Sequence, residues 1–118
     1  MPHRSLVVAA SILGFLGVAL GAFGAHALKL EGKPLDWWHT GSQYHLIHSL
    51  AALLAAMLGA TRSGWLFVAG TVVFAGSLYT MALTNLRWLG AITPIGGVCF
   101  LIGWGLLALS AYKQPSQT

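Results

Sequence analysis

The stretch Ser5–Leu28, SLVVAASILGFLGVALGAFGAHAL, decides the fold class of this chain. It contains no Lys, Arg, Asp or Glu, and its length is enough for a helix to cross a hydrocarbon core about 30 Å thick. Three more apolar stretches follow, at residues 40–60, 65–86 and 88–112. A helix satisfies its own backbone polar groups in lipid. We therefore predict an all-α integral membrane protein with four transmembrane helices.

The composition of the whole chain supports this class. Of its 118 residues, 57% are apolar and only 7% are charged, and the mean hydropathy is +0.76. A soluble domain keeps roughly a quarter of its residues charged, so that class is excluded. The net charge of +4 does not indicate nucleic-acid binding, because the six basic residues stand singly between apolar runs. We predict one transmembrane domain over residues 1–118, with the lipid bilayer as its partner.

The first apolar stretch also has features of a secretory signal peptide. It follows a positive start and ends in Ala25-His26-Ala27, which has the A-x-A form of a cleavage site. Its apolar part is longer than the core of a usual signal peptide. We therefore expect it to be a membrane span.

Four spans place both termini and the 61–64 turn on one side of the membrane, and a loop at 29–39 on the other. Each side has three Lys or Arg residues, so the positive-inside rule ties, and the N-terminal amine favours a cytoplasmic location for both termini. The six residues are Arg4, Arg62 and Lys113 against Lys29, Lys33 and Arg87. The 29–39 loop is expected to lie flat at the interface, with Leu30, Leu35, Trp37 and Trp38 toward lipid.

Glycines indicate how the spans pack. Helices in lipid associate through close backbone approach, because lipid tails are as apolar as the helices themselves. The first span has four glycines on one face and the last span has two that are seven residues apart: Gly14, Gly17, Gly21 and Gly24, and Gly96 and Gly103. We predict an antiparallel four-helix bundle with glycine-rich packing faces. A glycine seam that drives homo-oligomerisation is the alternative, because the G-x-x-x-G pattern is unspecific.

Pro94 interrupts the start of the last span, within Thr93–Gly97. Either it removes a donor and frees the Gly90 carbonyl, or Thr93 caps a helix whose first residue is Pro94.

The scarce polar residues gather toward the 29–39 loop. We predict that they form one internal polar cluster or a cavity in that half of the bundle, and that His26, His48, Tyr79 and Thr93 approach one another. The full candidate set is His26, Tyr44, His48, Tyr79, Asn85 and Thr93.

Three interpretations of this cluster compete. The side chains can bond across helices and fix the bundle. His26, His45 and His48 can instead bind a metal or haem, because imidazole is a good ligand for zinc, copper and haem iron. A proton or small-solute path is the third, since histidine titrates near neutral pH. No nucleophile, base and acid set is visible, so we predict no enzyme activity and no resident cofactor.

Four blocks of the sequence carry a family resemblance: GAFGAH at 21–26, QYHLIH at 43–48, GSLY at 76–79 and TPIGG at 93–97. In this order they resemble the domain of unknown function 423 family, whose eukaryotic relatives are named transmembrane protein 256. The likeness extends over about residues 5–112. It implies a small multi-span membrane protein, of the bacterial inner membrane where the source is a bacterium, and it implies no activity.

The resemblance also bears on the histidines. The family pattern includes the positions of His26, Tyr44 and His48, while that of His45 varies, which favours His26 with His48 over a His45–His48 metal site. The leading hypothesis is a non-enzymatic accessory, assembly or structural membrane component, acting alone, as a homo-oligomer or in a larger membrane complex. The alternative is a metal- or haem-binding protein, or one that conducts protons or small solutes.

Overall fold

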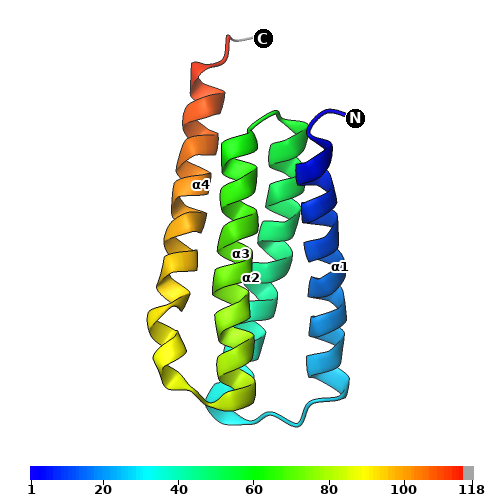
Figure 1. The fold of residues 1–118 in the computed structure, drawn as a ribbon, viewed down its shortest axis with the longest axis vertical. Helices are drawn as coiled ribbons and strands as arrows, with labels where there is room; N and C mark the ends of the chain where they lie inside the picture. The colour runs from blue at the N-terminus through cyan, green and yellow to red at the C-terminus, as the bar shows by residue number, and fades with distance from the viewer. Residues whose placement is uncertain (116–118) are drawn as a thin grey trace.

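The computed structural model describes residues 1–115, and this part of the chain is helical without strands (Figure 1). The elements are α1 (Arg4–His26), α2 (Gly32–Met57), α3 (Thr61–Thr84), the 3₁₀ helix η1 (Arg87–Ala91) and α4 (Thr93–Lys113). Among the described residues, three segments are long and apolar enough to cross a membrane: α1, α3 and residues 87–113. The predicted all-helical class is therefore confirmed, and these three segments are candidate membrane spans.

The four long helices lie side by side, and α1 begins at the same end of the structure at which α4 ends (Figure 1). The most extensive contacts join α2 to α3, and α1 and α4 pack mainly on α2 and α3 respectively. Alanines of α2 and Phe67 of α3 fill the centre of this arrangement. The two middle helices therefore supply most of the buried surface.

The second helix begins at Gly32 rather than Thr40, so the predicted loop at 29–39 is wrong. Pro34 lies in the first turn of α2, where a backbone N–H has no helical acceptor and its loss costs nothing. Gly32 adopts a positive φ of 61°, which lets the chain reverse direction within a short connection. Most of the expected interfacial loop is therefore the first turns of α2.

The outward orientation expected for Trp38 is also wrong. Its side chain is buried, and its indole N–H donates to the Leu20 carbonyl of α1 over 3.1 Å. Trp37 is half-buried and lies under the Arg87 guanidinium, 5.7 Å from the ring centre. These two tryptophans join the start of α2 to its neighbours.

The last span is divided into η1 and α4 close to Pro94, where the sequence predicts an interruption, but Thr93 is not the capping residue of α4. Ile92 is the capping residue, Thr93 is the first residue of α4, and Pro94 follows within the first turn. The Thr93 hydroxyl instead lies 3.2 Å from the Leu89 carbonyl of η1. The proline therefore removes an N–H that the first helical turn does not need.

Only two of the four α1 glycines lie in a helix interface. A Cβ on Gly24 would overlap the Trp38 indole, and one on Gly17 would lie 2.7 Å from a methyl group of Leu46. Gly14 and Gly21 have nothing within 4 Å of such a Cβ among the described residues. The expectation of packing at these two positions is therefore wrong, because α2 contacts a narrower stripe of α1.

The two α4 glycines expected to pack, Gly96 and Gly103, lie against α3. A Cβ on Gly96 would come within 2.8 Å of the Gly70 carbonyl, and one on Gly103 would lie 2.7 Å from the Phe67 ring. Gly70 and Gly96 thus let the two backbones approach directly, as small residues do in membrane helix pairs.

We expect Gly24→Ala to destabilise the fold by about 1–3 kcal/mol, the usual cost of overfilling a packed interface. The added methyl group would push Trp38 from α1 and break its hydrogen bond to Leu20. Thermal unfolding of the protein in detergent measures this loss.

The matched control is Gly21→Ala, which adds the same methyl group to open space on the same helix. Equal unfolding midpoints for the two variants would contradict the role of Gly24.

Candidate functional site

His45 is a buried histidine that joins three helices. Its Nε2 lies 2.7 Å from the Leu13 carbonyl of α1, and its Nδ1 lies 2.9 Å from the Tyr79 hydroxyl of α3. The carbonyl can only accept, so Nε2 carries the proton and Nδ1 accepts from Tyr79. The Tyr79 oxygen also lies 3.5 Å from Ser42 Oγ. Neutral His45 therefore has both ring nitrogens engaged within the chain.

Gly17 creates the space that this contact needs. Residue 17 lies four positions after Leu13, so it stands one turn along α1, beside the accepting carbonyl. A Cβ at this position would lie 3.2 Å from the His45 ring. The imidazole therefore reaches a backbone carbonyl in the middle of α1 because residue 17 has no side chain.

The same arrangement occurs one heptad further along the α1–α2 pair. Trp38 donates to Leu20, and Gly24, four residues after Leu20, leaves room for its indole. The acceptors Leu13 and Leu20 are seven residues apart, as are the donors His45 and Trp38, which run in the opposite direction. Two side chains of α2 thus bind two carbonyls of α1 in the same register.

His48 lies one turn further along α2 and faces α4 instead of α1. Its Nδ1 donates to the Tyr44 carbonyl over 2.9 Å, and its Nε2 accepts the Trp104 indole N–H over 3.0 Å. The ring stacks on Phe100, with centroids 3.6 Å apart. His48 is therefore also neutral, with both nitrogens engaged.

A third polar contact joins α3 to α4. Ser77 Oγ lies 2.6 Å from Thr93 Oγ1, and the two hydroxyls also contact the carbonyls of Phe74 and Leu89. This contact involves neither histidine.

The predicted single polar cluster is therefore wrong. Tyr79 meets His45 rather than His48, and Thr93 meets Ser77. His26 is exposed at the end of α1, about 20 Å along the helix from the Leu13 level at a rise of 1.5 Å per residue. The depth of a residue along a helix did not reveal which neighbour its side chain faces.

Two further candidates lie at the surface of the described chain. Tyr44 is 41% exposed and stacks beside His48 and Phe100. Asn85 is an exposed residue in the left-handed conformation that ends α3, a position for which asparagine is suited. Asn85 thus has a local structural role as a helix terminator.

The three histidines named as metal ligands do not form a metal site. Residues 1–115 contain no group of three or more His, Cys, Asp or Glu side chains arranged to hold a metal ion. His45 and His48 would each have to give up a hydrogen bond to free a nitrogen for a metal, and His26 lies at the end of α1. The residues therefore do not fit a metal or haem bound by this set.

Sequence reasoning missed Trp104 and underrated His45. An indole N–H in the middle of an apolar span needs a hydrogen-bond acceptor, and this requirement is the signal that could have found the contact between Trp104 and His48. The Leu13 carbonyl carried no signal, because every helical residue has one.

Comparison with known proteins agrees with the resemblance of the sequence blocks. The family model described as "Protein of unknown function (DUF423)" matches residues 20–97. The chain belongs to this family.

Curated relatives extend the match over almost the whole chain. The UPF0382 membrane protein YwdK of Bacillus subtilis is 44% identical over 120 residues, covering 93% of this chain and 98% of the relative. The UPF0382 inner membrane protein YgdD of Escherichia coli K12 is 42% identical, covering 96% and 93%. No solved structure matches the chain. These relatives identify a small membrane protein of unknown biochemical role.

We expect Tyr79→Phe to lower the stability of the protein by about 1 kcal/mol, since an interhelical hydrogen bond in a membrane protein contributes about 0.6 and at most about 1.7 kcal/mol. The variant keeps the ring but leaves His45 Nδ1 without its donor. Thermal unfolding in detergent measures the change, and a double-mutant cycle with His45→Ala isolates the coupling.

Tyr112→Phe is the matched control, because Tyr112 is 88% exposed. The same loss in both variants, or none in Tyr79→Phe, would contradict the His45–Tyr79 contact.

Proposed function

We propose that this protein is a non-enzymatic component of the bacterial inner membrane, an antiparallel four-span bundle that serves as an accessory or assembly element of a larger membrane complex. The inner-membrane location follows from its likeness to YgdD, which is named an inner membrane protein.

The membrane crossing of α2 is supported by its neighbours. It lies beside both α1 and α3, and short connections at 27–31 and 58–60 join it to them. If α1 and α3 both cross the membrane, α2 must return the chain across it. The polar residues His45, His48 and Ser49, which lower its hydropathy, are all buried inside the helix assembly.

One observation carries the non-enzymatic assignment: all four ring nitrogens of His45 and His48 are bonded inside the chain. A general base, a proton carrier or a metal ligand needs a nitrogen that its substrate, proton or metal can reach. Buried polar groups that satisfy one another fix helix register instead.

We expect the purified protein to contain no stoichiometric metal and no haem absorption, and proteoliposomes containing it to show no proton flux above empty liposomes. Metal analysis, visible spectroscopy and a pH-sensitive dye make these measurements. Bound metal, or a flux that His48→Ala removes, would overturn the assignment.

The accessory role predicts a stable larger assembly. Native electrophoresis of membranes solubilised in mild detergent should place the chain in a complex above the mass of the 12.4 kDa monomer with its detergent. Migration as the monomer alone would contradict this role.

The topology is tested with single cysteines in a Cys99→Ser background. An impermeant maleimide added to spheroplasts should label Lys29→Cys, whereas Pro2→Cys, Thr61→Cys and Gln114→Cys should react only after permeabilisation. These positions report the two connections and the two ends of the chain. Outside labelling of Pro2→Cys would reverse the orientation, and labelling of Lys29→Cys and Thr61→Cys from one side would exclude a crossing by α2.

A further inference from the structure

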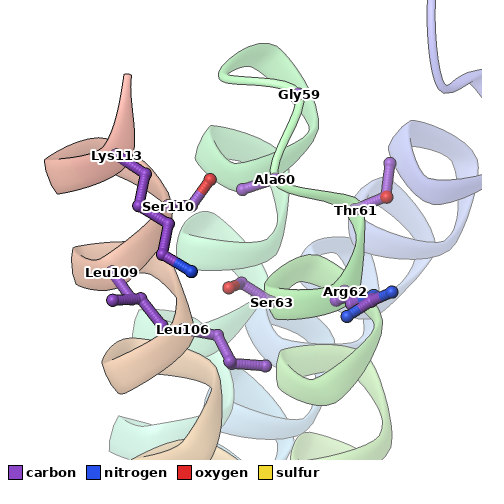
Figure 2. Close-up of a pocket in the computed structure, with 9 residues that line it drawn as sticks. All are labelled: Gly59, Ala60, Thr61, Arg62, Ser63, Leu106, Leu109, Ser110 and Lys113. Carbon is purple, nitrogen blue, oxygen red and sulfur yellow. The ribbon is translucent and has the colours of Figure 1, made fainter. Parts of the chain in front are cut away.

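A cavity of about 300 Å³ opens where the α2–α3 turn meets the last turns of α4. It lies at the end of the molecule where α1 begins and α4 ends, away from His45 and His48. Polar side chains line it from both helices, whereas α4 also contributes the apolar Leu106 and Leu109 (Figure 2). Its volume is at the lower end of the range for small-molecule sites.

The N-terminus of α3 lies at this cavity and has no side-chain cap. Ala60 occupies the capping position, and the first turn contains no acidic residue. The N–H groups of the first turn have no helical acceptors, and the positive end of the helix dipole lies there. Anions bind at such helix ends.

Ser63 gives a second, independent indication of a ligand. The residue is only 2% exposed, and Figure 2 shows its hydroxyl directed toward α4, into the cavity. Ser49, Thr71 and Ser77 donate to backbone carbonyls, whereas within residues 1–115 the Ser63 hydroxyl has no hydrogen-bond partner. Every side-chain nitrogen or oxygen of the described chain that solvent cannot reach has a hydrogen-bond partner. The Ser63 hydroxyl is therefore reached through the cavity, and its O–H is free to donate to a ligand.

The charge of the cavity is positive. In Figure 2 the Lys113 ammonium and the Ser110 hydroxyl extend from α4 into the gap beside α3, while the Arg62 head lies on the other side of the first α3 turn. The only acidic side chains of the chain, Glu31 and Asp36, lie at the start of α2, at the opposite end of the structure.

We propose that this cavity binds a phosphate group. Free N–H groups of α3, the Ser63 and Ser110 hydroxyls and the Lys113 ammonium supply donors and one cation, and a phosphate supplies acceptor oxygens and negative charge. The cavity lies at the end of the helices, where phospholipid headgroups meet a membrane protein, and its apolar wall on α4 fits the chain of a lipid. Basic pockets between membrane helices bind anionic headgroups in this way.

Native mass spectrometry of the full chain in detergent tests the proposal with three probes: phosphatidylglycerol, diacylglycerol with the same acyl chains, and inorganic phosphate. We expect the protein to retain phosphatidylglycerol in preference to diacylglycerol, which lacks the phosphate. Lys113→Gln should weaken the retention about fivefold, since a basic residue near an anionic surface contributes about that factor. Ser63→Ala should weaken it several-fold as well.

Lys33→Gln is the matched control, because Lys33 is also an exposed lysine but lies at the other end of the structure. Ser11→Ala, at an exposed serine of α1, matches the second variant. Both controls should leave the affinity within twofold of the unmodified chain. Thermal unfolding confirms that each variant is folded.

The probes distinguish the source of the phosphate. Retention of phosphatidylglycerol that inorganic phosphate does not displace identifies a lipid headgroup, whereas binding of inorganic phosphate that depends on Lys113 and Ser63 identifies a soluble phosphate. Equal retention of diacylglycerol and phosphatidylglycerol, no binding of either phosphate probe, or an equal effect of Lys113→Gln and Lys33→Gln would overturn the proposal. None of these outcomes bears on the role of His45 and His48.

Discussion

The structure depends on the imidazole of His45, which joins a backbone carbonyl of α1 to a hydroxyl of α3. In lipid, helices gain little from burying apolar surface against one another, so specific contacts must set their positions. A buried imidazole with one acceptor and one donor partner has a fixed tautomer and a fixed orientation. It therefore sets the positions of α1 and α3 relative to α2, and Trp38 repeats the contact to α1 one heptad away.

This arrangement explains the glycines of α1 better than a general rule about small residues does. Gly17 and Gly24 are required because each stands beside a carbonyl that receives a side chain of α2. Their role is to admit a ring to the backbone, whereas Gly70 and Gly96 let the backbones of α3 and α4 approach each other directly. The two pairs of helices thus use glycine for different physical reasons.

The middle of the molecule and one of its ends differ in their free hydrogen-bonding groups. Near the middle, His45 and His48 form hydrogen bonds to neighbouring helices, so their donors and acceptors already have partners. At the end that holds the α2–α3 turn, the Ser63 hydroxyl has no partner within residues 1–115, and the first N–H groups of α3 have no helical acceptor. Lys113 lies beside them. Free hydrogen-bonding capacity, which a ligand needs, is therefore found at the end of the bundle and not at its histidines.

The sequence by itself determined the class of this protein, its helices and most of their bounds. Apolar runs of about 20 residues leave the backbone no stable alternative to helix in lipid, and four sequence blocks identified the family. The sequence did not reveal where α2 begins. Lys33, Asp36 and the two tryptophans led to the prediction of a loop, although their backbone is helical. Only the tertiary structure decided which polar residues meet. Depth along a helix can be counted from the sequence, but the rotation of each helix about its axis depends on packing against its neighbours, and this rotation brought His45 to Tyr79, His48 to Trp104, and left His26 exposed.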